Sequence, residues 1–201
     1  MRRASVSFLA IITLVGLVFG GFLISSPSEN TNPEAVDTGL LYPSDSPISG
    51  NENAPIKIAV FSDYLCPYCK DAHNTINDVL AKNGGNVVVY YRNLIVHESA
   101  GILAQAALAA NKQGKFEQFN NILFERSVES TEDALVAIAA EIGLDVERFK
   151  ADLNSQAVLD IIGQDEEDAT SLQVRGTPTI FVNDQVVDDF RSLPEVVNGM
   201  I

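Results

Sequence analysis

Residues 56–70 read IKIAVFSDYLCPYCK, a short apolar segment that leads directly into the only two cysteines of the chain, Cys66 and Cys69. The apolar run 56–62 is typical of a strand covered on both faces, and residues 67–82 predict a helix that ends at an Asn-Gly-Gly sequence. Cysteines so close together cannot link distant parts of a fold. At the start of a helix, this spacing favours reversible thiol–disulfide chemistry.

The elements that follow predict an α/β fold. Residues 87–91 (VVVYY) are β-branched or aromatic and indicate a second strand. Strands at 179–182 and 185–187, joined by an Asn-Asp turn, and a short helix from Leu193 end the chain. The long segment between them predicts helices over residues 100–111, 116–126, 131–142, 146–153 and 157–172.

This order of elements is that of a thioredoxin fold. A strand–helix–strand unit comes first, and a hairpin and a helix complete the sheet. The helical stretch at about 97–172 is then an inserted α-helical cap domain. We expect helices on both faces of the sheet.

The composition is that of one globular domain with a membrane anchor. Of the 201 residues, 46% are apolar and 20% are charged. The formal net charge of −14 argues against nucleic acid or anionic lipid headgroups as partners, since both repel an acidic surface.

The N-terminal segment predicts a single membrane-spanning helix. Residues 6–24 form an almost uninterrupted apolar run without charge, long enough to cross a bilayer. Arg2 and Arg3 precede it, which places residues 1–5 in the cytoplasm and the body of the protein outside. We expect an uncleaved signal anchor, with cleavage near Gly20-Gly21 or Ser25-Ser26 as the alternative.

Residues 25–53 are rich in Ser, Asn, Pro, Asp, Glu and Gly, a composition that predicts a flexible linker. The folded domain is then expected over residues 54–201.

The two cysteines are expected to divide the chemistry between them. Cys66 lies at the helix start, where the exposed N–H groups and the helix dipole stabilise a thiolate. Cys69 lies one turn further in and is expected to be more buried, so that Cys66 forms the mixed disulfide and Cys69 resolves it. The alternatives are an inert cysteine pair or a metal site that adds His73, which we otherwise expect to be an exposed helix residue.

A second motif, Gly176-Thr177-Pro178-Thr179, precedes the late strand. A proline there is compatible with an edge strand or a turn. Combined with the upstream cysteines, it predicts a cis Thr177–Pro178 bond whose main chain faces Cys66. An extended substrate segment would pair with that main chain as an added strand.

Together, residues 61–69 (FSDYLCPYC) and 176–179 (GTPT) resemble the DsbA-like thiol–disulfide oxidoreductases of the thioredoxin superfamily. Segments 46–55 and 113–116 are also similar, so the resemblance covers residues 46–201. It implies that Cys66 is the nucleophile, Cys69 the resolving thiol and Pro178 the cis proline. It also implies that the remaining active-site loop residues that meet the substrate are Pro67, Tyr68 and Thr177. No bound organic cofactor and no metal are expected.

The sequence departs from that family at two places. Many members carry a buried glutamate where this chain has Val60, and Asp63, nearer the motif, is expected to be a simple turn or cap residue. The segment 92–97 lacks the proline common in relatives. The acidic run 165–168 (DEED) is expected to be a solvated helix face.

These observations predict a membrane-tethered, extracytoplasmic enzyme that donates its Cys66–Cys69 disulfide to the thiols of exported proteins. The resemblance implies a quinone-linked membrane oxidase as the partner that regenerates it. A monomer is expected, because no dimerisation domain is visible. The rival hypotheses are a reductase or isomerase with the same residues and a tethered chaperone or metal-binding module.

Overall fold

The computed structural model describes residues 36–201. The predictions made for residues 1–35, namely the cytoplasmic N-terminus, the membrane anchor over 6–24 and the first part of the linker, lie outside the described residues. Within residues 36–201, no helix is both long enough and apolar enough to cross a membrane.

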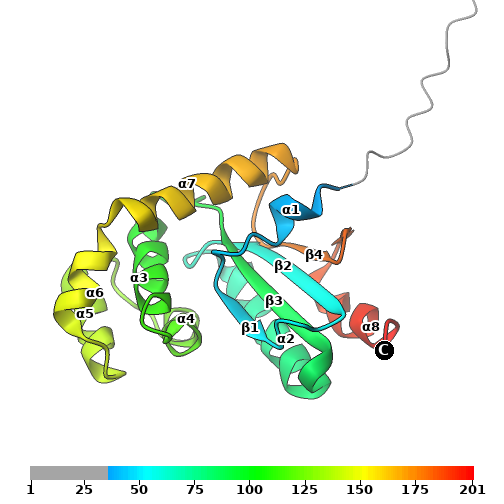
Figure 1. Cartoon of the computed structure of the whole chain (residues 1–201), viewed down its shortest axis with the longest axis horizontal. Helices are drawn as coiled ribbons and strands as arrows, with labels where there is room; N and C mark the ends of the chain where they lie inside the picture. The colour runs from blue at the N-terminus through cyan, green and yellow to red at the C-terminus, as the bar shows by residue number, and fades with distance from the viewer. Residues whose placement is uncertain (1–35) are drawn as a thin grey trace, which may run out of the picture. The chain divides into compact units, whose positions relative to one another are not determined.

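A five-stranded mixed sheet forms the centre of the domain, in the order β1-β3-β2-β4-β5 (Figure 1). Strands β2 and β3 are parallel, and the other neighbouring pairs are antiparallel. The strands are β1 (Ile48–Gly50), β2 (Ile56–Ser62), β3 (Val87–Asn93), β4 (Thr179–Val182) and β5 (Gln185–Val187). The described helices are α1 (Thr38–Leu41), α2 (Pro67–Asn83), α3 (Gly101–Asn111), α4 (Phe116–Glu125), α5 (Glu132–Glu141), α6 (Val146–Leu153), α7 (Gln156–Ser171) and α8 (Leu193–Asn198).

Helices cover both faces of the sheet, because the central strand β2 is apolar on both sides. Ile58 and Val60 pack in the larger core, which includes buried residues of α2 and α8. Ala59 and Phe61 point the other way and pack with Leu41 of α1 and with α7. The predicted two-sided burial of this strand is therefore confirmed.

The helical segment between β3 and β4 lies beside the sheet, and α7 returns along it toward β4 (Figure 1). Its last three helices, α5, α6 and α7, begin at side-chain caps: Thr131, Asp145 and Ser155 each accept a hydrogen bond from a main-chain N–H in the first turn. These are the helices that the sequence predicts, within a few residues at each end.

The linker predicted over residues 25–53 is too long at its C-terminal end, because the folded domain begins earlier in the chain. Residues 36–53 belong to the folded unit: Leu41 is fully buried, and β1 pairs with β3, with Ile48 opposite Tyr90. The average composition of this segment is polar, yet a few apolar side chains are enough to fill the sheet face under α7 and extend the sheet edge. The domain thus starts upstream of residue 54.

The acidic run on α7 is only partly solvated, which corrects the prediction of a solvated face. Glu166 and Glu167 are exposed, whereas Asp165 and Asp168 are 2% and 4% exposed and both bind Arg92 at the end of β3. Residues three apart on a helix share one face, so two of the four carboxylates turn inward together.

Candidate active site

Cys66 occupies the N-cap of α2, and Pro67 is the first helical residue. A proline in this position costs no helical hydrogen bond. The main-chain oxygen of Cys66 accepts from the N–H groups of Cys69 and Lys70, at 3.0 and 3.3 Å, which fixes the first turn. The thiol of Cys66 thus lies at the positive end of the helix dipole, where an anion is stabilised.

The loop before β4 closes over this thiol. The Thr177–Pro178 peptide bond is cis, as predicted. The thiol of Cys66 donates to the main-chain oxygen of Thr177, with a distance of 3.4 Å between Sγ and O. The two sequence motifs, more than a hundred residues apart in the chain, therefore meet at Cys66.

Cys69 lies beneath Cys66 and is 1% exposed, whereas Cys66 is 8% exposed. Both cysteines are free thiols in the structure. Burial raises the pKa of the Cys69 thiol to about 12, although the N–H of Asp63 donates to its Sγ at 3.5 Å. Cys69 is therefore a protonated thiol at neutral pH, unless a neighbouring group removes its proton.

Asp63 is more than the expected turn or cap residue. It is 1% exposed, and its carboxylate accepts from the main-chain N–H groups of Leu65 at 2.7 Å and of Val96 and His97 at 2.8 Å. The Nδ1 atom of His97 lies 3.2 Å from the same carboxylate. Asp63 thus holds the loop after β3 against the turn that leads from β2 to Cys66.

His73 is buried, which corrects the prediction of an exposed helix residue. It is 3% exposed, and its ring stacks on Phe124 of α4, with 4.6 Å between the ring centroids. Its spacing of four residues from Cys69 places both side chains on the same face of α2, a signal that was present in the sequence. Cys66 and Cys69 also pack against Phe124.

The other predicted site residues are placed as follows. Val60, the position noted above as a departure from the resembled family, is 3% exposed and packs in the larger core. Tyr68 is 65% exposed on the outer side of the motif. Pro67 lines the groove described next, and Pro178 is half-buried beside Thr177.

A groove of about 260 Å³ begins at Cys66. It runs between the start of α2 and the end of α4, and Leu65, Leu123 and Val128 contribute apolar side chains to it. Its charged lining residues are Lys70 and Arg126. Such a groove can hold an apolar side chain next to the reacting sulfur.

The metal-site alternative finds little support in residues 36–201, where no group of three or more His, Cys, Asp and Glu residues is arranged to hold a metal ion. Of the ligands it would need, His73 instead places its Nε2 3.0 Å from the amide nitrogen of Asn77. The arrangement is suited to thiol–disulfide exchange: a sulfur at a helix start that lines a groove, a more deeply buried sulfur one turn behind it and a main-chain oxygen facing the first.

Comparisons with known proteins agree with this geometry. A family model described as Thioredoxin matches residues 44–198. A thioredoxin-like oxidoreductase from Silicibacter pomeroyi superimposes with a TM-score of 0.72 at 32% identity, covering 82% of this chain and 97% of that one. The thiol-disulfide exchange protein alpha-DsbA2 from Wolbachia pipientis has a TM-score of 0.74 at 23% identity, covering 82% and 91%.

A curated relative gives a partial match. The Na(+)/H(+) antiporter NhaA of Herminiimonas arsenicoxydans is 36% identical over 135 residues, which are 67% of this chain and 22% of the antiporter. This chain therefore spans about a fifth of that relative's length.

Proposed function

The chain belongs to the thioredoxin family, and from this premise we propose that it is a protein-disulfide oxidoreductase that donates the Cys66–Cys69 disulfide to exported proteins. The observation that carries the proposal is the position of Cys66 at the N-cap of α2, with its thiol 3.4 Å from the Thr177 oxygen and Cys69 buried behind it. The match to the antiporter, limited to part of its length, contributes no ion transport to this proposal.

The reaction proceeds in two exchanges. A substrate thiolate attacks the Sγ of Cys66, and the Cys66–Cys69 bond breaks with its electron pair on Cys69. A second substrate thiolate then displaces Cys66, which leaves as a thiolate stabilised at the start of α2. The substrate leaves with a disulfide, and the protein is left with two thiols.

The substrate is expected to bind as an extended segment along the Thr177 main chain. The Thr177 oxygen already accepts a bond from the Cys66 thiol, so a substrate N–H can replace that donor. A side chain beside the substrate cysteine would enter the groove lined by Leu65 and Val128. Affinity then comes from the main chain, which suits an enzyme with many substrates.

The cellular setting is part of the proposal. The apolar run 6–24, preceded by Arg2 and Arg3, supports an anchor with the enzyme on the outer side of the membrane. A quinone-linked oxidase in the same membrane would return the protein to its disulfide form. Protease digestion of intact cells tests the placement: an extracytoplasmic domain is cut without lysis, and a cytoplasmic one is protected.

The reduction potential of the Cys66–Cys69 pair, measured against glutathione buffers, tests the direction of exchange. A value near about −120 mV marks a disulfide donor, and a value near about −270 mV makes the protein a reductase. A Cys66→Ser variant should lose all exchange, and Cys69→Ser should accumulate the mixed disulfide. If Cys66→Ser keeps full function in preventing aggregation of unfolded substrates, the binding-module hypothesis replaces the enzyme.

A further inference from the structure

A polar cleft of about 460 Å³ lies between the sheet and the inserted helices, apart from the active site. It is bounded by the C-terminal half of α2 and the N-terminal half of α4, whereas the groove at Cys66 is bounded by the other halves of these two helices. The cleft and the groove share no lining residue. The proposed exchange reaction therefore makes no use of the cleft.

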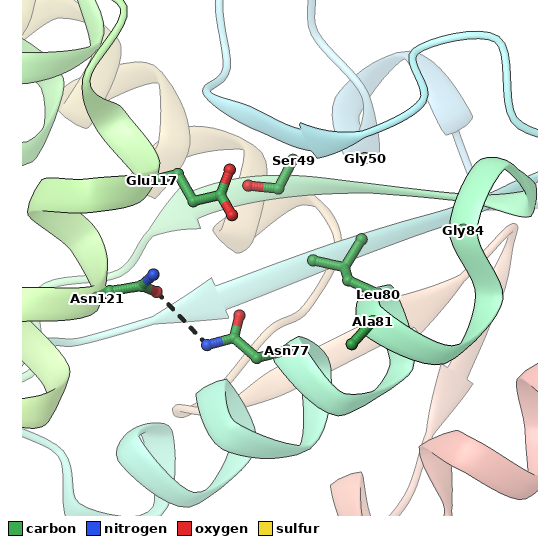
Figure 2. A pocket seen from close by; sticks show the side chains of 8 residues that line it. All are labelled: Ser49, Gly50, Asn77, Leu80, Ala81, Gly84, Glu117 and Asn121. Carbon is green, nitrogen blue, oxygen red and sulfur yellow. Dashed lines mark hydrogen bonds between the residues drawn. The ribbon is translucent and has the colours of Figure 1, made fainter.

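The lining of the cleft combines polar and apolar side chains from three elements (Figure 2). They are Ser49 from β1, Asn77, Leu80 and Ala81 from α2, and Glu117 and Asn121 from α4. Among these lining residues, all in the described part of the chain, only Glu117 is charged. The volume lies within the range of about 300–1,000 Å³ that is typical of small-molecule sites. The cleft thus has the size of a ligand site and a negative charge.

Ser49 brings a buried hydroxyl without a partner to this cleft. The residue is 5% exposed, and within residues 36–201 its Oγ makes no hydrogen bond. Buried polar atoms in proteins nearly always have a partner, so each exception needs a reason. Figure 2 shows the hydroxyl turned toward the carboxylate of Glu117. A ligand in the cleft would supply the missing partner.

The hydroxyl of Tyr91 places Ser49 and Glu117 at the same end of the cleft. Burial raises the pKa of Tyr91 to about 12, the Ser49 hydroxyl opposes this rise, and the charge of Glu117 adds to it. Tyr91 shares a sheet face with Ser49, because it lies two residues after Val89, the residue opposite Ser49 in the ladder of β1 and β3. Tyr91 is close enough to influence the Ser49 hydroxyl, but it does not complete a hydrogen bond with it.

Asn77 adds a further acceptor to the wall of the cleft. Its amide nitrogen donates to Oδ1 of Asn121 at 3.4 Å and faces Nε2 of His73 at 3.0 Å, so both of its N–H groups are engaged. This arrangement turns the amide oxygen into the cleft, where it makes no hydrogen bond within the described residues (Figure 2). The unused polar atoms of Asn77, Ser49 and Glu117 are therefore all oxygens.

The charge of Glu117 remains available to a ligand. Within residues 36–201 it makes no ion pair, although Lys115 lines an adjoining hollow together with it. Its place in the first turn of α4 is favourable by itself, because a carboxylate there faces the positive end of the helix dipole. That effect accounts for Glu117, but it does not explain the unused oxygens of Ser49 and Asn77 beside it.

We propose that this cleft binds an organic cation with several N–H donors, a guanidinium or alkylammonium group on a short apolar chain. The cation pairs with the carboxylate of Glu117, and its N–H groups donate to Oγ of Ser49 and Oδ1 of Asn77. The apolar chain contacts Leu80 and Ala81. A bare divalent ion fits poorly, since it needs oxygen ligands on several sides within about 2.6 Å, and one carboxylate in so wide a cleft does not surround it.

The test titrates the full-length chain, in a nonionic detergent, with propylguanidinium. Propylurea, which has nearly the same shape and no charge, is the matched control. NMR follows the side-chain amides of Asn77 and Asn121 and the main-chain amide of Ser49. We expect saturable shifts of these signals with propylguanidinium and none with propylurea. The amide signal of Cys66 should not move, because the groove there shares no residue with the cleft.

Two variants examine the residues that hold the cation. Glu117→Gln should weaken propylguanidinium binding about tenfold, and Ser49→Ala about fivefold. Ser49→Ala should not lower the urea midpoint of the free protein, because the hydroxyl that it removes has no partner there. The control is Glu132→Gln, which removes an exposed glutamate from the first turn of α5 and should leave the affinity unchanged.

A third ligand distinguishes the two sources of such a cation, a free small molecule and an arginine side chain of a protein. If the cleft takes a side chain, acetyl-Gly-Arg-Gly-amide should bind at least as tightly as propylguanidinium. If it takes a free molecule, the tripeptide should bind about tenfold more weakly, because its main chain does not fit. Both results keep the proposed chemistry.

The inference is overturned if propylguanidinium gives no saturable shifts, or if propylurea gives the same shifts. Equal losses of affinity in Glu117→Gln and Glu132→Gln would also overturn it, since they would show a general effect of the protein's charge. So would a strongly destabilised Ser49→Ala, which would mean that the hydroxyl has a structural role. None of these outcomes depends on the redox chemistry of the cysteines.

Discussion

Arg92 and Asp165 form a buried ion pair, with 2.5 Å between Nε and Oδ1, that joins the end of β3 to the middle of α7. The second carboxylate oxygen of Asp165 accepts from the main chain and the side chain of Asn93, both at 2.8 Å. Asp168 binds the other end of the guanidinium. This cluster fixes the last residues of β3, directly before the loop that Asp63 holds.

Replacing Arg92 with Met should strongly destabilise the protein. The change leaves the two carboxylates of Asp165 and Asp168 buried without a cation, which costs about 3–5 kcal/mol of unfolding free energy. Urea denaturation measures the loss. Arg126→Met, at an exposed ion pair with Glu141, is the control and should barely move the midpoint. Equal midpoints for both variants would show that the buried cluster adds no stability.

The parts of this fold that could be predicted from the sequence are those that depend on local sequence patterns. The helix from Pro67 follows from a proline and an apolar periodicity, and the helix after Thr131 follows from its cap. The approach of Thr177 to Cys66 was predicted from the proline motif read together with the two cysteines, because both motifs are short and recognisable.

Burial of single polar side chains could not be predicted in the same way. Asp63 meets His97 across 34 residues and Arg92 meets Asp165 across 73, so each contact depends on how separate elements pack. His73 became buried because α4 places Phe124 on its ring. The linker prediction failed for a related reason: average polarity conceals one well-placed apolar residue, Leu41.

Substituting Asn for Asp63 should loosen the cysteine loop. Asn has one acceptor oxygen, so some of the N–H groups of Leu65, Val96 and His97 lose their partner inside the protein. We expect a loss of about 1–3 kcal/mol in unfolding free energy. Amide hydrogen exchange at Val96 should also become faster. The control is His97→Gln, which removes a half-exposed ring and should leave that exchange slow.

The stability of the reduced protein should fall at alkaline pH because of Cys69. Its thiol pKa is raised from 9.0 to about 12 by burial, so between these values the folded state binds a proton that the unfolded state has lost. Its contribution is complete below about pH 9 and decreases by up to about 1.4 kcal/mol per pH unit above it. Denaturation of the reduced protein from about pH 8 to pH 11 measures this.

Cys69→Ala isolates that contribution, since the buried tyrosines Tyr64 and Tyr91, whose pKa values are also raised by burial, contribute equally to the pH dependence of both proteins. The wild type should lose stability faster with rising pH than the variant. Parallel curves would mean that water reaches the thiolate of Cys69 in the folded protein.

Replacing Val128 with Trp should weaken the reaction with peptide substrates selectively. Val128 lines the groove of about 260 Å³ that begins at Cys66, and a larger ring there fills space meant for a substrate side chain. We expect a KM for a dithiol peptide raised about tenfold, a loss of about 1.4 kcal/mol in binding. The reaction with glutathione, which is too small to need the groove, should keep its rate. Val186→Trp, on the exposed strand β5, is the matched control. If both thiol substrates slow equally, Val128 supports the fold of the site and the groove does not hold the substrate.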